Sequence, residues 1–157
     1  MAKISILEYL TRQLEGTLTH DMRTSMNYPT KISNTLKMEI VAVALGTATV
    51  EINADASVHG NQQGTVHGGL ISELADAAIG TAHSTLADEG SSFTTIELKI
   101  NFYRPVWRSK LHASARPLHS GNTISHYICE VRNEDGKTVA VATSTIMNLY
   151  NDKAVGR

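Results

Sequence analysis

The sequence predicts an α+β fold in which a curved antiparallel sheet of five to six strands wraps around one long central helix, with a short helix near the N-terminus. Three features predict it: one long segment of helical composition after Gly69, several stretches in which apolar and polar residues alternate, and turn sequences between those stretches. A single long helix among so many strands favours a sheet that curves around it.

The first part of the chain is expected to form a helix and then a flap or linker. Apolar residues recur at spacings of three and four over residues 4–15, which indicates an amphipathic helix that ends at Gly16. Residues 17–33 are polar and irregular and contain Pro29. We therefore separate an N-terminal helix and flap, a main domain and a C-terminal tail, over residues 1–33, 34–150 and 151–157.

The strands of the main domain are predicted from their period of two. A hairpin that turns at Gly46 comes first, and the clearest alternation follows the central helix and ends before Pro105. Turn sequences at residues 119–122 and 133–136 separate the later strands. The predicted strands cover residues 36–40, 49–53, 95–102, 110–118, 123–132 and 138–150.

The central helix is expected to begin near Gly68 and to end between Leu86 and Gly90. Its unpaired N–H groups and the positive end of its dipole could hold a carbonyl oxygen that gains negative charge. Asp76 lies two turns inside and has no basic residue three or four positions away, so helix chemistry does not explain it. On a helical wheel one face is apolar and the other is polar. The polar face could be an ordinary solvated surface, which is the alternative to a functional role for Asp76. The apolar face carries Ile71, Leu74, Ala75, Ala78 and Ala82, and the polar face Ser72, Glu73, Asp76, Gly80 and His83.

Composition and charge exclude several classes of function. The chain has 157 residues, which fits one main domain, and 14 basic against 15 acidic residues give no electrostatic case for binding nucleic acid or an anionic membrane. No stretch approaches the roughly 20 apolar residues that span a bilayer, and the N-terminus is too polar for a signal sequence. The single cysteine, Cys129, is expected to be a buried strand residue. We expect a cytoplasmic protein without a metal site, because the histidines lack ligand spacing.

The loop and helix from Asn61 to Asp76 resemble a known signature. They match the pattern Asn-x-x-Gly-x-x-His-Gly-Gly-x6-Asp of hot-dog-fold acyl-CoA thioesterases of the phenylacetate-pathway (PaaI-like) type. The resemblance continues through Phe93 to Pro105, which is similar to the central strand of that family, and covers about residues 30–150. It implies a thioester hydrolase that needs no cofactor and acts on acyl-CoA.

The resemblance also implies roles for five residues. The Gly68 N–H and the Asn61 side chain would hold the thioester oxygen, and Asp76 would be the general base on water or the nucleophile. His67 would lie beside the sulfur. Thr95 would position the water, with Thr94 as the alternative one residue earlier.

Coenzyme A contacts are expected from Gly69 and from basic residues after the central strand. Arg104, Arg108 and Lys110 are candidates for its phosphates. Here the chain departs from the family, because Asn122 stands where the turn often carries a lysine.

The family forms dimers, often dimers of dimers, in which loop and carboxylate meet across the interface, so we expect a homo-oligomer and possible homotetramer.

A non-catalytic acyl-CoA sensor is the alternative function. A hot-dog hydratase or dehydratase acting on acyl-CoA or acyl carrier protein is a third, supported by the fold alone. The acyl group stays open, with flap residues as its possible contacts: Met22, Met26, Tyr28 and Ile32.

Overall fold

The computed structural model describes residues 2–155. It contains one long helix, shorter helices and a large antiparallel sheet, in an order close to the one predicted from the sequence. The elements are β1 (Ala2–Lys3), α1 (Ile6–Glu15), β2 (Met22–Arg23), α2 (Lys31–Leu36), β3 (Glu39–Ala44), β4 (Thr47–Asp55), α3 (Ala56–His59), α4 (Gly68–Ser84), β5 (Ser92–Phe102), β6 (Arg108–Ser120), β7 (Ile124–Arg132), β8 (Thr138–Leu149) and the 3-10 helix η1 (Asn151–Ala154).

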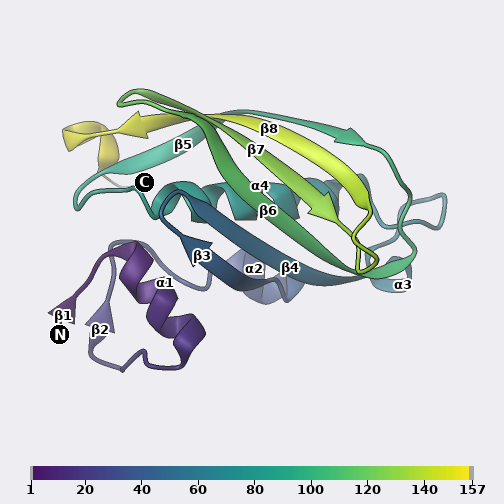
Figure 1. Cartoon of the computed structure of the whole chain (residues 1–157), viewed down its shortest axis with the longest axis horizontal. Helices are drawn as coiled ribbons and strands as arrows, with labels where there is room; N and C mark the ends of the chain where they lie inside the picture. The colour runs from purple at the N-terminus through teal and green to yellow at the C-terminus, as the bar shows by residue number, and fades with distance from the viewer. Residues whose placement is uncertain (1, 156–157) are drawn as a thin grey trace.

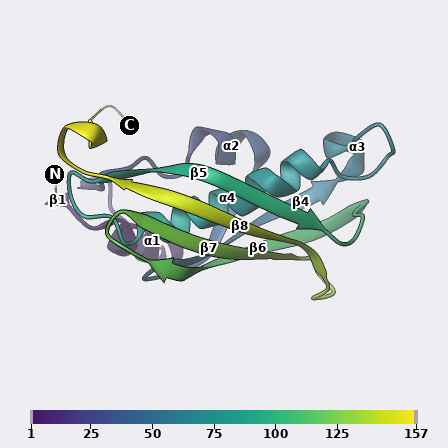
Figure 2. The same cartoon turned by 90° about the horizontal axis from the view of Figure 1, so that it is seen from above.

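The main sheet has six strands in the order β3-β4-β6-β7-β8-β5, and every neighbouring pair is antiparallel. It curves around α4, which lies along its inner face (Figure 1). Figure 2 shows the same helix beneath the strands from a second direction. The predicted α+β layout, one long helix wrapped by six strands, is therefore confirmed.

The core lies between α4 and the sheet. The five residues predicted for the apolar face of the helix are all 3% exposed or less. They meet apolar residues of four strands, among them Val50, Leu111 and Ile146. A fully buried Leu or Ile contributes about 1.5–3 kcal/mol to folding, so this face fixes α4 against the sheet. The residues on the polar face of α4, Asp76 among them, are held in place as a result.

His83, predicted on the polar face of α4, is buried, so the competing interpretation of a solvated face is wrong for this residue. Its side chain is 4% exposed and packs edge-on against Phe93 and Tyr127. Asn148 donates through its Nδ2 to two backbone carbonyls, so its Oδ1 accepts the His83 Nε2–H at 2.7 Å, and the Tyr127 hydroxyl then donates to Nδ1 at 3.2 Å. Burial lowers the pKa of His83. The histidine is a neutral, satisfied core residue.

The strand predicted from Leu36 begins later. Residues 31–36 form α2, because the Thr30 hydroxyl accepts the Ser33 N–H at the start of this helix and Lys37 ends it in the left-handed conformation. The strand starts at Glu39 instead. The predicted N-terminal helix is confirmed as α1, capped by Ser5 and ended by Gly16.

The two edges of the main sheet are β3 and β5. On β5, Ile96 sits at a bulge and is 54% exposed, and Phe102 at the strand end is 50% exposed. Exposed apolar residues on an open edge are typical of a strand that pairs with another chain. Among residues 2–155, no helix has both the length and the apolar character needed to cross a membrane.

Candidate active site

The start of α4 presents backbone donors in a defined arrangement. His67 caps the helix, and its Nδ1 accepts the Gly69 N–H at 2.8 Å. Because Nδ1 is an acceptor here, the ring proton lies on Nε2, which is free to donate toward the exposed side. Gly68 is the first helical residue, so its N–H has no acceptor within the helix. Of the two glycine N–H groups, that of Gly68 is therefore the one available to a ligand.

Asn61 holds the loop that leads to this helix. Its Oδ1 accepts the N–H groups of Gln63 and Thr65, and its Nδ2 donates to the Thr65 hydroxyl at 3.0 Å. An amide nitrogen has two hydrogens, so one remains for a ligand. Asn61 and Gly68 line one pocket of about 350 Å³, together with Tyr103.

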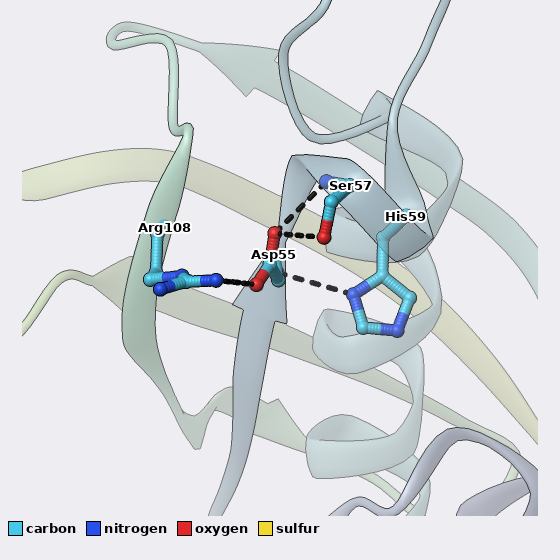
Figure 3. A network of polar contacts seen from close by, with 4 residues as sticks. All are labelled: Asp55, Ser57, His59 and Arg108. Atoms are coloured by element: carbon cyan, nitrogen blue, oxygen red, sulfur yellow. Dashed lines mark hydrogen bonds and ion pairs between the residues drawn. The ribbon is translucent and has the colours of Figure 1, made fainter.

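A network behind the loop fixes where it lies (Figure 3). Asp55 accepts from the Ser57 backbone and hydroxyl at the start of α3 and pairs with Arg108 at the start of β6. These hydrogen bonds to Ser57, and then the Arg108 guanidinium, lower the pKa of Asp55 to about 2. At the end of α3, the His59 carbonyl accepts the His67 N–H at 2.8 Å. The helix cap is thus tied to two strand ends.

Asp76 lies on the open face of α4. Its carboxylate is half-buried, and the Thr95 hydroxyl donates to it at 3.5 Å, the long limit of a hydrogen bond. Burial raises the pKa of Asp76, and the Thr95 contact opposes that rise only in part. One turn earlier, burial and the neighbouring Asp76 raise the pKa of Glu73. It is Thr95, not the alternative Thr94, that contacts Asp76.

The donors at the start of α4 and the Asp76 carboxylate do not share a pocket within one chain. Gly68 and Asp76 are eight residues apart, which corresponds to about 12 Å along the helix axis. Asp76 instead opens onto a larger cavity of about 810 Å³ between α4 and the N-terminal segment. A single carbonyl group cannot contact both from the same chain.

The residues expected to contact coenzyme A are spread over the molecule. Arg104 lines the pocket with Asn61 and Gly68, whereas the Arg108 side chain pairs with Asp55 and Lys110 with Glu51. Asn122 follows the far end of β6, a 13-residue strand that spans about 40 Å. Within one chain the structure does not bring Asn122 near the arginines.

Cys129 is fully buried on β7, where burial raises the pKa of its thiol to about 12, so the expected core role is confirmed. Within residues 2–155 no three His, Cys, Asp or Glu side chains gather as a metal site requires.

Sequence reasoning anticipated part of the lining of the cavity beside Asp76 but not its place against α4. Three of the four suspected flap residues line it, namely Met26, Tyr28 and Ile32, whereas Met22 lies in β2 and does not. The signal was weak because these side chains come from an irregular loop and a short helix that has no buried residue. These residues do not recur at the spacing of a helix or a strand.

The fold and this site match known proteins. A family model described as "Thioesterase superfamily" matches residues 63–140. A proposed esterase from Archaeoglobus fulgidus is 30% identical over 123 residues, which cover 78% of this chain and 77% of that protein. The medium/long-chain acyl-CoA thioesterase YigI of Salmonella typhimurium is 28% identical over 134 residues, with 76% and 86% covered.

Among solved structures, a mutant of the phenylacetic acid degradation protein PaaI from Thermus thermophilus superposes with a TM-score of 0.69. It is 27% identical, and the match covers 75% of this chain and 98% of that one. The chain therefore belongs to the thioesterase superfamily. Within it, the chain is a PaaI-like hot-dog thioesterase, that is, a thioester hydrolase.

Proposed function

We propose that this protein hydrolyses the thioester of acyl-CoA, with Asp76 acting on water or on the carbonyl carbon. The observation that carries the proposal is a half-buried carboxylate with a raised pKa that opens onto a cavity of about 810 Å³. Perturbed carboxylates in cavities are typical of catalytic groups. An acyl-CoA substrate is further supported by the relative named as an acyl-CoA thioesterase.

The residues have distinct roles in the proposed reaction. The Gly68 N–H and the free Asn61 Nδ2 hydrogen stabilise the carbonyl oxygen as it gains charge, and one such donor is typically worth about 2.7–4 kcal/mol of barrier. As general base, Asp76 takes a proton from water while the oxygen of that water attacks the carbonyl carbon. The carbon–sulfur bond then breaks, and the thiolate of coenzyme A leaves and takes up a proton.

A nucleophilic role of Asp76 gives the same products. In that route its carboxylate attacks the carbonyl carbon, expels the thiolate and forms a mixed anhydride, which water then hydrolyses. In both routes the Nε2–H of His67 lies on the exposed side of the helix start, where it can donate to the thioester. Thr95 keeps the Asp76 carboxylate oriented.

The roughly 12 Å between Gly68 and Asp76 supports a site that is shared between two copies of the chain. We propose that the open edge at β5 pairs with its counterpart in a second copy, giving a dimer or a dimer of dimers. In that assembly the donors of one chain face the carboxylate of the other. A C2 arrangement makes two equal sites.

Mixing two inactive variants tests the shared site. Asp76→Asn removes the carboxylate and Asn61→Ala removes an oxyanion donor, and each alone should lower the rate about 10²–10⁴-fold. In a mixed dimer one site carries both changes and the other carries neither. Co-refolding equal amounts should therefore restore about one quarter of the parent activity in a random C2 dimer.

The readout is release of free thiol from acyl-CoA, with each variant refolded alone as the control. If the mixture is no more active than its components, the site lies within one chain and the sharing is wrong. If Asp76→Asn alone keeps the parent rate across acyl-CoA substrates, the role of Asp76 is wrong. Binding of acyl-CoA without thiol release by the parent protein would favour the alternative, a sensor.

A further inference from the structure

One wall of the cavity beside Asp76 comes from a part of the chain that the family model does not cover. That wall is made by residues 26–40, which include α2 and the start of β3, and the other wall is the open face of α4. Its volume of about 810 Å³ lies in the range of about 300–1,000 Å³ that is usual for small-molecule sites. The apolar side chains that line it are Leu14, Met26, Tyr28, Pro29, Ile32, Met38, Ile40, Ala77 and Phe93.

Gly80 stands on the helix wall of this cavity, one turn after Asp76. It lies in the interior of α4, where glycine lowers helix stability relative to alanine. Its φ is not positive, and a Cβ added there would meet no heavy atom within 4 Å. Neither backbone strain nor close packing requires a glycine at this position. What the missing side chain leaves is space along the helix, next to the carboxylate.

Beyond Gly80, the helix wall of this cavity ends at Thr81. Tyr28 lines the cavity, and its hydroxyl bonds to the Ser84 hydroxyl in the last turn of α4. Asp76 and Thr81 are five residues apart, so the space along the helix beyond the carboxylate is about 7.5 Å long, which fits an extended chain of roughly six carbon–carbon bonds. Methionines on the facing wall adapt to a flexible apolar occupant.

The charges of the cavity select against acidic acyl groups. Glu73 and Asp76 are its two half-buried charged residues, whereas Lys37 and Glu39 are exposed at the rim. A second carboxylate on the substrate would lose hydration among apolar side chains and meet two acidic groups. An uncharged aliphatic chain meets neither penalty.

We propose that this cavity holds the acyl chain of the substrate, that the chain is uncharged, aliphatic and of medium length, and that Gly80 sets the longest chain accepted. The inference rests on the proposed function, because the thioester must lie at Asp76 for the chain to pass Gly80. It adds a substrate class and a residue that determines specificity.

The test is a chain-length profile of thiol release with acetyl-, butyryl-, octanoyl-, decanoyl- and palmitoyl-CoA. Gly80→Leu fills the space one turn beyond Asp76, so the ratio of kcat/KM for octanoyl-CoA to that for butyryl-CoA should fall tenfold or more. Gly80→Ala should shift the same ratio in the same direction by less. Because alanine and leucine are better helix formers than glycine, neither variant should have a lower Tm.

Lys137→Leu is the matched control, since it adds the same side chain on an exposed hairpin that does not line the cavity. It should leave the ratio unchanged. A folded Gly80→Leu protein with the parent ratio, or with equal losses for both substrates, overturns the inference. So does a parent profile with its maximum at acetyl-CoA.

Failure of the proposed function gives a different result. If the parent protein hydrolyses no acyl-CoA, the reaction is wrong but the cavity can still be tested by calorimetry. In that case octanoyl-CoA should bind the parent protein at least tenfold more tightly than it binds Gly80→Leu, and butyryl-CoA should bind both alike. Equal binding of octanoyl-CoA by both proteins refutes the acyl-chain site independently of catalysis.

Discussion

Asp76 and Asp55 should respond in opposite ways to replacement by asparagine. Burial raises the pKa of Asp76 above 3.8, so the unfolded chain loses this proton first as the pH rises. The stability present below pH 3.8 is therefore lost as the pH rises through the folded pKa, and the ionised carboxylate destabilises the fold at pH 7. Asp76→Asn should raise the free energy of unfolding at pH 7 while it removes activity.

The size of this gain follows from how little the Asp76 carboxylate contacts. Among residues 2–155, its one hydrogen bond to a side chain is the 3.5 Å contact from Thr95, and the Oδ1 of an asparagine can still accept it. Removing a poorly paired, half-buried charge belongs with the stabilising changes that commonly yield about 0.5–2 kcal/mol. For a chain of this size, that corresponds to a rise in Tm of about 1–8 °C.

Asp55 is the matched control. Hydrogen bonds from Ser57 and the Arg108 guanidinium lower its pKa to about 2, so it contributes stability above pH 3.8 that is lost as the pH falls toward 2. Asp55→Asn should therefore destabilise the protein at pH 7. The loss should disappear in acid.

Urea unfolding between pH 3 and pH 8, at one protein concentration, measures both variants against the parent. Both effects on the free energy of unfolding should be small at pH 3 and larger at pH 8, but they differ in sign. Asp76→Asn should be more stable than the parent, and Asp55→Asn should be less stable. The reasoning is refuted if Asp76→Asn lowers stability at pH 7, because the carboxylate would then be paired rather than merely buried.

Three further changes probe the site and its support. His67→Asn keeps a cap at the start of α4 but removes the Nε2–H, so activity should fall with little change in Tm, whereas His67→Ala should also cost about 0.5–2 kcal/mol in urea unfolding. Thr95→Val removes a donor that lowers the pKa of Asp76, so the acid limb of the rate–pH profile should move to higher pH. Tyr127→Phe leaves the buried Nδ1 of His83 without a donor and should cost about 1–3 kcal/mol without a change in KM.

The main features of the fold could be predicted because its elements are strongly periodic. The alternation around Ile100 and the apolar stripe around Leu74 each bury one face, and burial is what a periodic pattern encodes. The short elements could not be predicted in this way. The helix α2 depends on one cap at Thr30 and a left-handed residue at Lys37, which leave almost no trace in a hydrophobic pattern.

The candidate site was predictable where the residue types themselves determine the backbone conformation. A helix start at Gly68 follows from the loop glycines and the helical composition after them, and an unpaired N–H follows from the start. The sequence did not predict which charged side chains form ion pairs with one another. Arg108 looked free to bind phosphate, but its contact with Asp55 depends on the register that places Asp55 opposite Arg108 across β4 and β6. The burial of His83 likewise depends on Tyr127, 44 residues away.

The geometry of α4 connects assembly with the acidity of its carboxylate. The positive end of a helix dipole acts mainly within the first turn, so the start of α4 does little for Asp76 two turns along the same helix. In a shared site the start of the partner helix would face Asp76, and its free N–H groups would favour the charged carboxylate. Pairing would then lower the pKa of Asp76 from its value in the single chain. Because the partner helix would then offset part of the cost of burying the charge, the stability gain of Asp76→Asn should be smaller in the assembled protein than in the single chain.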